Sequence, residues 1–276
     1  MPDQPLLTRT AWITGSSRGI GRVIADHFSS LGAQVAIHGT SPTSTRAFGE
    51  ADSLEAVAQE IEQAHGGEVL PVWGDLTDEE TVQRLASQIR DRFGRIDILV
   101  NCAGGDIGAQ GTMGENAGKP QANDAVHVSL ADIRAVIDRN VMTCILCCRE
   151  VAPEMMARKE GWIVNISSTA GTKGRESGAI YSTAKAAVNQ YSRCLADQMR
   201  PYNVYVNVVA PGPIMTPRFL ASRATDEAQK NASGTLDRYG QSGEIARAVA
   251  FFVTDASSYV SGQVLRVDGG RQLWAG

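Results

Sequence analysis

Short apolar runs alternate with amphipathic segments along almost the whole chain. The runs are rich in Val and Ile with few polar interruptions, a pattern typical of strands that are buried on both faces. The segments between them repeat their apolar positions with the period of an amphipathic helix. The pattern predicts strands at residues 10–14, 34–38, 68–73, 96–101, 161–167, 204–209 and 263–267. It predicts helices at about residues 18–31, 53–64, 78–93, 129–158, 181–199 and 244–253.

This alternation of strand and helix predicts an α/β fold. Parallel strands need crossover connections, which are right-handed and place helices on both faces of the sheet. No Pro/Ser-rich linker, repeat or low-complexity tract divides the chain. We therefore expect residues 1–276 to form a single Rossmann-type domain with a doubly wound, parallel, seven-stranded sheet.

Two connections are too long for simple turns. Residues 102–128 are rich in glycine, and residues 211–243 are mostly polar with a few apolar side chains. Long ordered loops in compact α/β domains are usually functional, although a surface insertion explains the first equally well. We expect residues 211–243 to close over a substrate, with a mobile surface excursion as the alternative.

Composition and charge narrow the partners. The net charge of -4 argues against broad nucleic-acid binding, and no window is apolar enough for a membrane span. The N-terminal residues lack the pattern of a targeting signal, so a cytoplasmic protein that acts on small molecules is expected. The five cysteines have no zinc-like spacing, and we predict no metal site.

A glycine-rich turn follows the first predicted strand. Gly15, Gly19 and Gly21 lie between that strand and the first helix. Glycine lets the backbone approach a pyrophosphate closely, and the start of the helix offers free amides to it. Any tight turn can contain glycines, but this position in a parallel sheet is where dinucleotides bind.

The end of the second predicted strand bears on cofactor choice. Sites that select NAD usually carry a carboxylate there, which accepts hydrogen bonds from the ribose hydroxyls. Here the positions hold Gly39, Thr40 and Ser41, and Arg18 or Arg46 could add positive charge. The pattern favours NADP(H), with NAD(H) as the alternative.

Tyr181 and Lys185 are four residues apart in a predicted helix. Residues at this spacing share one face, so an ammonium would lie beside a phenol and favour its ionised form. A phenol with a lowered pKa could donate or accept protons near neutral pH. Simple packing of Tyr181 with a solvated Lys185 is the alternative.

These pieces together resemble the short-chain dehydrogenase/reductase family, from Thr10 to Gly270. The resemblance rests on motifs in the family's order: Thr14-Gly-Ser-Ser-Arg-Gly-Ile-Gly21, Asp75, Asn101-Cys-Ala-Gly104, Asn140, Ser168, Tyr181-x-x-x-Lys185, Pro211-Gly-Pro-Ile-Met-Thr216 and Val267-Asp-Gly-Gly270. Two departures stand out. Cys102 replaces the usual second Asn, and the segment between Gly104 and Ser129 is longer than is typical.

The resemblance implies roles for individual residues. Tyr181 would be the catalytic acid/base, Lys185 would lower its pKa and bind the nicotinamide ribose, Ser168 would orient the substrate oxygen, and Asn140 would support a proton relay. Ser167 is the rival for Ser168. Cofactor contacts would come from Gly15, Ser17, Arg18, Gly19, Ile20, Gly21, Thr40, Ser41, Asp75, Leu76, Asn101, Ala103, Gly104, Tyr181, Lys185, Pro211, Gly212, Ile214 and Thr216.

The expected activity is interconversion of a ketone and a secondary alcohol by hydride transfer, with a small carbonyl or alcohol compound as substrate. Within the same fold, a 3-oxoacyl thioester, a sugar or a polyol are alternative substrates. A non-catalytic dinucleotide sensor is the alternative from another class, because fold alone does not guarantee activity. Lys173, Arg175 and Arg218 could form a basic entrance or bind a small acid, with ordinary solvated charge as the simpler interpretation.

The resemblance also implies a homotetramer. Ala184, Ala187, Val188 and Tyr191 form a face of apolar and small residues that could pack against a copy of itself. Packing against the core of the same chain explains that pattern equally well.

Overall fold

Nine strands and nine helices are assigned in the computed structural model, which describes residues 4–231 and 233–273. Residues 1–3 and residue 232 lie outside the described residues. Residues 1–3 belong to the N-terminal segment that lacks the pattern of a targeting signal, and residue 232 belongs to the expected lid. The strands are β1 (Thr10–Thr14), β2 (Gln34–Gly39), β3 (Val69–Trp73), β4 (Ile98–Asn101), β5 (Gly161–Ile166), β6 (Val204–Pro211), β7 (Ile214–Met215), β8 (Gly240–Gln241) and β9 (Val264–Val267). The helices are α1 (Gly19–Ser30), α2 (Leu54–His65), α3 (Glu79–Phe93), α4 (Glu115–Gly118), α5 (Leu130–Ile137), α6 (Thr143–Arg158), α7 (Ala179–Met199), α8 (Pro217–Ala221) and α9 (Ser242–Phe252).

The main sheet has seven strands in the order β3-β2-β1-β4-β5-β6-β9, and every pairing is parallel. The predicted fold class and all seven predicted strands are confirmed. Along the chain, β2 and β3 are added outward on one side of β1, and β4 then pairs with the other side of β1. The order therefore reverses between β1 and β4, which is where a doubly wound sheet binds its ligand.

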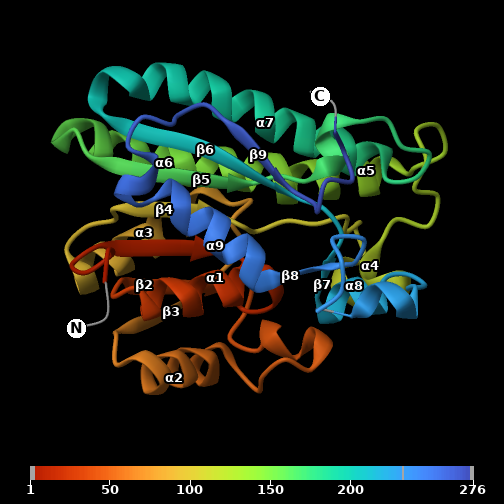
Figure 1. Ribbon diagram of the computed structural model, residues 1–276, viewed down its shortest axis with the longest axis horizontal. Coiled ribbons are helices and arrows are strands. Elements are labelled where there is room, and N and C mark those ends of the chain that lie inside the picture. The colour runs from red at the N-terminus through yellow and green to blue at the C-terminus, as the bar shows by residue number, and fades with distance from the viewer. Residues whose placement is uncertain (1–3, 232, 274–276) are drawn as a thin grey trace.

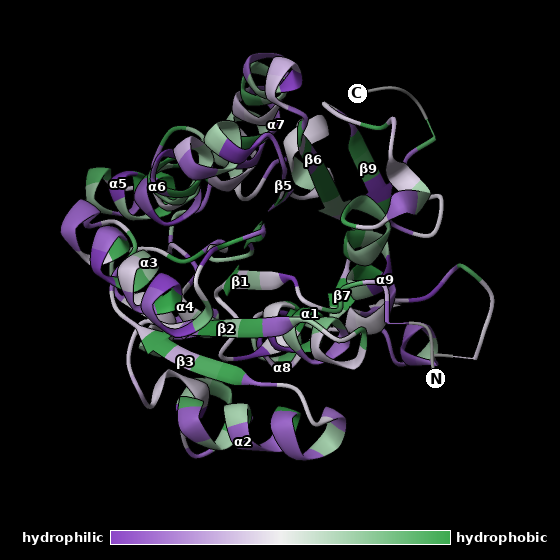
Figure 2. Cartoon of the chain, turned by 90° about the vertical axis from the view of Figure 1, so that its left-hand side faces the viewer, coloured by the Kyte–Doolittle hydropathy of each residue, from purple (hydrophilic) through white to green (hydrophobic). Residues whose placement is uncertain are grey.

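Two apolar cores cover the two faces of the sheet. Neighbouring residues of one strand alternate between them: Ile13 packs with α1, α2 and α9, and Trp12 packs with α3, α6 and α7. Figure 2 shows the result, with apolar strands such as β3 and β6 inside and polar surfaces on α2 and α3. Each fully buried large side chain contributes about 1.5–3 kcal/mol, which explains why near-continuous apolar runs are required in the strands.

One predicted helix is wrong in detail. Residues 129–158 do not form a single α-helix, because a wider π-helical turn at residues 138–142 separates α5 from α6. Asn140 lies in this turn and its side-chain amide donates a hydrogen bond to the Val136 carbonyl. π-helical turns often occur at functional sites, where they re-aim a side chain.

The two long connections meet beyond the carboxyl ends of the strands. Residues 102–128 include α4, and residues 211–243 contain β7, α8 and β8, which the sequence pattern did not predict. Figure 1 shows α4 and α8 together beside β7 and β8, and their contact is direct. That residues 1–276 form a single domain stays a prediction. Among the described residues, no helix is both long and apolar enough to span a bilayer.

Candidate active site

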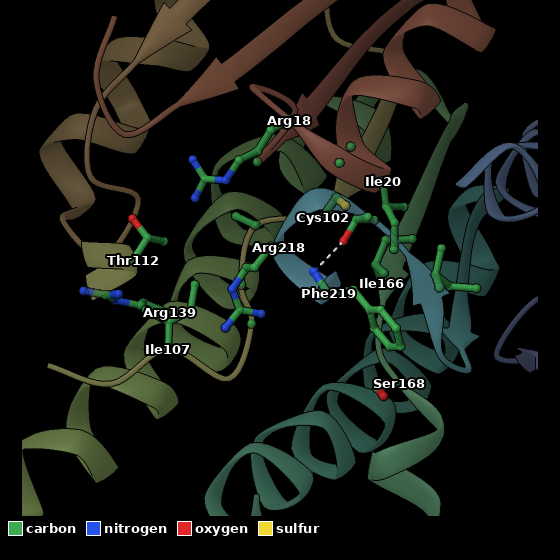
Figure 3. A pocket seen from close by; sticks show the side chains of 18 of the residues that line it. Arg18, Ile20, Cys102, Ile107, Thr112, Arg139, Ile166, Ser168, Arg218 and Phe219 are labelled. Carbon is green, nitrogen blue, oxygen red and sulfur yellow. Dashed lines mark hydrogen bonds between the residues drawn. The ribbon is translucent and has the colours of Figure 1, made fainter. Parts of the chain in front are cut away.

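A cavity of about 1390 Å³ opens at the carboxyl ends of the strands (Figure 3). It begins at the glycine-rich turn after β1 and extends to the start of α7 and to α8. Most predicted site residues line it: Gly15, Ser17, Arg18, Gly19, Ile20, Gly21, Thr40, Ser41, Asp75, Leu76, Ala103, Gly104, Ser168, Tyr181, Lys185, Pro211, Gly212, Ile214 and Thr216. Asn101 and Asn140 are not among the lining residues.

The glycine turn packs directly on the loop after β4. A Cβ atom at Gly15 would lie 2.6 Å from the Ala103 Cα, and Gly15 also has a φ of 63° that disfavours other residues. The Thr14 hydroxyl accepts hydrogen bonds from the amides of Cys102 and Ala103 at 3.0 and 3.1 Å. The ends of β1 and β4 are therefore held together at the switch point of the sheet.

His38 holds this turn from the side, a role that the sequence did not reveal. The Gly15 amide donates to Nδ1 of His38 at 3.1 Å, and Nε2 lies 3.1 Å from the Gly74 carbonyl. Burial lowers the pKa of His38 to about 4, so the ring is neutral at physiological pH. A neutral ring that donates from Nε2 and accepts at Nδ1 satisfies both contacts. The only signal for this role in the sequence was the position of His38 at the end of a predicted buried strand.

Glu50 brings an unpredicted carboxylate into the cavity. Its Oε2 accepts a hydrogen bond from the Gly19 amide at 2.8 Å, at the first turn of α1. Burial lowers the pKa of the nearby Arg18, while the charge of Glu50 acts in the opposite direction. The Arg18 guanidinium donates to the Ser44 carbonyl at 2.6 Å, which holds it against residues 44–48. The sequence offered no clue to Glu50, because it lies well beyond the end of the second strand.

The residues present fit a dinucleotide. The turn after β1 packs closely on the start of α1, since a Cβ at Gly21 would lie 2.4 Å from the Gly15 carbonyl oxygen. Arg18 precedes α1 and has no acceptor with which to cap its first turn, where the Gly19 amide donates to Glu50. Free amides at a helix N-terminus favour phosphate groups.

Asn101 does not face the cavity with its side chain. Its Nδ2 donates to Oδ1 of Asn165 at 2.8 Å and to Sγ of Cys148 at 3.2 Å. Asn165 in turn donates to the Ser192 hydroxyl at 2.8 Å. This side chain therefore ties β4 to β5 and α7, and the expected contact of Asn101 with a cofactor stays a prediction.

Asn140 supports the neighbouring loop. Its Oδ1 accepts from the Gly105 amide at 2.9 Å, and its nitrogen donates to the Gly105 carbonyl at 2.9 Å. These bonds fix the backbone next to Gly104, which does line the cavity. The expected place of Asn140 in a proton relay stays a prediction.

Tyr181, Lys185 and Ser168 come together in the cavity. The Lys185 ammonium lies 5.8 Å from the centre of the Tyr181 ring, so both residues share one side of α7. That ammonium donates to the Ile166 carbonyl at 2.8 Å. Ser167 and Ser168 both line the cavity, but the Ser167 hydroxyl donates to the Lys185 carbonyl inside the fold. Ser168 is half-buried and accepts from the Ala170 amide, which leaves its proton available.

The expected electrostatics of Tyr181 need correction. We expected Lys185 to lower the pKa of Tyr181, whereas burial raises it. The groups that act against burial are the Ser168 hydroxyl and the positive charges of Arg218 and Arg175. Burial also lowers the pKa of Lys185 to about 8, which weakens its charge as a partner for the phenol.

The chain matches a family model described as short chain dehydrogenase over residues 9–227. It is 35% identical to a 3-oxoacyl-[acyl-carrier-protein] reductase of Synechocystis sp., with 98% of this chain and 99% of that protein covered. It is also 35% identical to a cyclohexanol dehydrogenase of Rhodococcus sp., with 96% and 97% covered. Among solved structures, it is similar to a 7 alpha-hydroxysteroid dehydrogenase complexed with NADH and 7-oxo glycochenodeoxycholic acid. There the TM-score is 0.82 and the identity 32%, with 97% of this chain and 96% of the other covered.

The family model spans most of the chain, and the relatives cover nearly all of it at one-third identity. In this chain, the cavity at the end of the seven-stranded parallel sheet is lined by Tyr181, Lys185 and Ser168. The chain therefore belongs to the short-chain dehydrogenase/reductase family.

Proposed function

We propose that Tyr181 is the proton donor and acceptor of a dehydrogenase/reductase that interconverts a ketone and a secondary alcohol. The observation that carries this role is the meeting of Tyr181, Ser168 and Lys185 in the cavity that begins at the glycine turn. The oxidoreductase activity itself follows from the family, whose members act on CH-OH and carbonyl groups. This membership favours an enzyme over the non-catalytic sensor.

The chain's own residues divide the work. In reduction, Tyr181 gives its phenolic proton to the substrate oxygen, and in oxidation it removes the proton from the hydroxyl. Ser168 donates a hydrogen bond to the same oxygen, and Lys185 binds the ribose beside the nicotinamide. The bound nicotinamide supplies or accepts the hydride. Asn140 holds residues 104–105 and supports the relay that returns the proton to Tyr181.

NADP(H) is the cofactor that we favour over NAD(H). Arg18 and Arg46 bring positive charge to the cavity next to Thr40 and Ser41, and β2 ends without a carboxylate. Glu50 works in the other direction, because its charge lies beside the Gly19 amide and repels any phosphate there.

Arg18→Met is expected to weaken NADPH binding by about tenfold and NADH binding by much less. Loss of a charge-assisted hydrogen bond to the 2'-phosphate costs about 1.5–3 kcal/mol, and NADH has no such group. Dissociation constants of both dinucleotides, measured by fluorescence titration, check this. Equal losses for the two cofactors would contradict the preference for NADPH.

The pH dependence of alcohol oxidation offers a test of Tyr181 as the base. Its raised pKa means that oxidation should quicken as the pH rises through the alkaline range. Arg218 favours the phenolate and Asp106 opposes it, so Arg218→Met should move the profile to higher pH and Asp106→Asn to lower pH. The measurement is kcat/KM for alcohol oxidation against pH. Shifts in the same direction for both variants would remove Tyr181 from this role.

The substrate side of the cavity is formed by the two long connections. Arg218 and Phe219 of α8 line it, together with Ile107 and Thr112 from residues 102–128. Phe219 packs edge-on against Tyr239, with 5.0 Å between ring centres, which joins the start and the end of residues 211–243 to each other. We infer that residues 211–243 are a lid over the substrate. A 3-oxoacyl thioester, a sugar or a polyol stay alternatives to a simple ketone.

A homotetramer stays a prediction, and light scattering would measure it. Two residues of the α7 face that was expected to contact a second copy, Ala184 and Val188, are buried within the same chain. Edge strand β9 is the better candidate, since Leu265 on it and Phe251 on α9 are both more than one-third exposed. A cytoplasmic location and the absence of metal and nucleic-acid partners stay predictions.

A further inference from the structure

A second, small pocket lies against the catalytic tyrosine. It encloses about 80 Å³ and is lined by Asp106, Lys119, Arg175, Ser177, Tyr181, Arg218 and Arg223. We call these residues the basic pocket. Four of them are cationic and one is anionic, and Tyr181 also lines the main cavity. Since a liquid water molecule takes about 30 Å³, the pocket accommodates a group of a few atoms and not an extended chain.

The cations come from segments that are distant in the sequence. Arg218 of α8 donates to the Asp106 carbonyl at 2.7 Å, and the Lys119 ammonium donates to the Ser222 carbonyl at 3.0 Å. The Arg223 guanidinium lies 4.3 Å from the centre of the Phe219 ring. The lengthened segment 102–128 and the segment after β7 therefore build this pocket together. The sequence pointed to Arg175 and Arg218 as a basic entrance, a site for a small acid or solvated charges, and did not reveal Lys119 or Arg223.

These cations are held by neutral groups. Among the described residues, none of Lys119, Arg175, Arg218 and Arg223 lies within ion-pair distance of a carboxylate. Burial lowers the pKa values of Lys119, Arg218 and Arg223, and the charges of neighbouring cations lower them further, while the charge of Asp106 raises them. Gathering like charges in a half-buried space costs free energy unless an anion joins them.

A buried donor points to the same conclusion, whereas a buried acceptor beside it requires a hydrogen-bond donor and not an anion. Nε of Arg218 is a buried donor without a partner in the described part of the chain. Oδ1 of Asp106 is buried without a partner as well, while Oδ2 accepts from Asn123 at 2.8 Å. Because Nη2 of Arg218 already donates to the carbonyls of Asp106 and Ala117, its free Nε–H can give one charge-assisted hydrogen bond to an oxoanion. Buried polar groups without partners are uncommon unless a ligand or water completes them.

We propose that the substrate carries an oxoanion, a carboxylate or a phosphate, which binds in the basic pocket while its carbonyl or hydroxyl group faces Tyr181 and Ser168. This inference deepens the proposed function and rests on Tyr181 as the reacting acid. A keto or hydroxy acid satisfies it with a carboxylate, and a phosphorylated ketone satisfies it with a phosphate. The excess of three positive charges in the pocket fits either group.

The test compares charged ketones with uncharged partners of similar shape. The probes are 2-, 3- and 4-oxocarboxylates against their methyl esters, and dihydroxyacetone phosphate against dihydroxyacetone. We expect the wild-type enzyme with NADPH to prefer one acid or phosphate over its uncharged partner by at least about tenfold in kcat/KM. Whether the acid or the phosphate series shows the preference identifies the source of the anion.

Lys119→Met and Arg223→Met should each remove most of this preference, because kcat/KM falls much more for the charged ketone than for its uncharged partner. Arg193→Met, which removes an exposed charge on the outer side of α7, is the matched control and should keep the preference. Thermal unfolding of every variant confirms that it folds. A wild-type enzyme that treats charged and uncharged ketones alike, or variants that retain the preference, would overturn the proposal.

Calorimetric titration of the NADPH complex with the same acids gives a readout that does not depend on turnover. An acid that binds to the wild type, binds weakly to Arg223→Met and is never reduced supports the basic pocket but contradicts the proposed function. If uncharged ketones are reduced and no acid or phosphate binds, the proposed function is supported and the basic pocket is contradicted. The two ideas can therefore fail separately.

Discussion

Tyr181→Phe is expected to lower kcat for ketone reduction by about 10³-fold while the dissociation constant of NADPH changes little. A positioned acid contributes about 10²–10⁴-fold to such a proton transfer, and Phe has no proton to give. The Tyr181 side chain is half-buried where it lines the cavity, which limits bulk water as a substitute donor. Phe keeps the aromatic ring at the start of α7, so the change removes only the hydroxyl group. Turnover from NADPH absorbance and binding from fluorescence titration measure the two effects separately.

Tyr205→Phe is the matched control for this change. Tyr205 lies on β5's neighbour β6, and its hydroxyl donates to the Ser258 carbonyl, away from the cavity. Its loss should leave turnover close to wild type. Wild-type turnover in Tyr181→Phe would exclude the tyrosine as the acid. Loss of NADPH binding together with turnover would show that its main role is to shape the cofactor site.

The sheet could be predicted from the sequence because its signals are local. Each strand is a short apolar run buried on both faces, and the boundaries of β1 agree with the pattern at both ends. The turn after β1 follows from the spacing of its glycines. These features depend on neighbouring residues, so a single sequence contains enough information to find them.

The π-helical turn at residues 138–142 could not be predicted in the same way. The apolar period continues through it from α5 into α6, so the pattern reads as one helix. The break depends on Asn140, whose side chain bonds to Gly105 in a distant loop. Such long-range contacts leave no local signal in the sequence.

The partners of the cofactor turn were missed for a related reason. His38 and Glu50 bond to the amides of Gly15 and Gly19 across the cavity wall. Each is an ordinary residue in its local context, at a strand end and after a short 3-10 helix. Only the packing of β2 and the residues that follow it against the turn gives them a role.

The electrostatics of Tyr181 show how burial changes a sequence argument. Spacing on a helix correctly placed Lys185 on the same side as Tyr181. It could not reveal that the lysine is itself buried and bonded to Ile166, or that the charges of Arg218 and Arg175 favour the phenolate. Desolvation is the largest effect on the pKa of each group, raising that of Tyr181 and lowering that of Lys185.

Gly15→Ala is expected to weaken NADPH binding by at least about 100-fold, equivalent to about 2.7 kcal/mol. The φ of 63° costs a non-glycine residue about 1–2 kcal/mol, and the added Cβ would lie 2.6 Å from the Ala103 Cα. Because the added Cβ would clash with the backbone of Ala103, the clash can be relieved only if the turn after β1 moves away from the loop after β4. Both loops line the cavity, so that movement displaces the amides that bind the dinucleotide.

Gly66→Ala separates backbone strain from the steric clash. Gly66 has a φ of 72° at the end of α2, and a Cβ there would meet nothing within 4 Å. It should lose about 1 kcal/mol of stability in urea unfolding and keep the wild-type affinity for NADPH. If Gly15→Ala loses only as much stability as Gly66→Ala and binds NADPH normally, then close contact between the two loops does not shape the cofactor site. A large loss of affinity in Gly15→Ala alone would instead locate the dinucleotide at the point where the strand order reverses between β1 and β4.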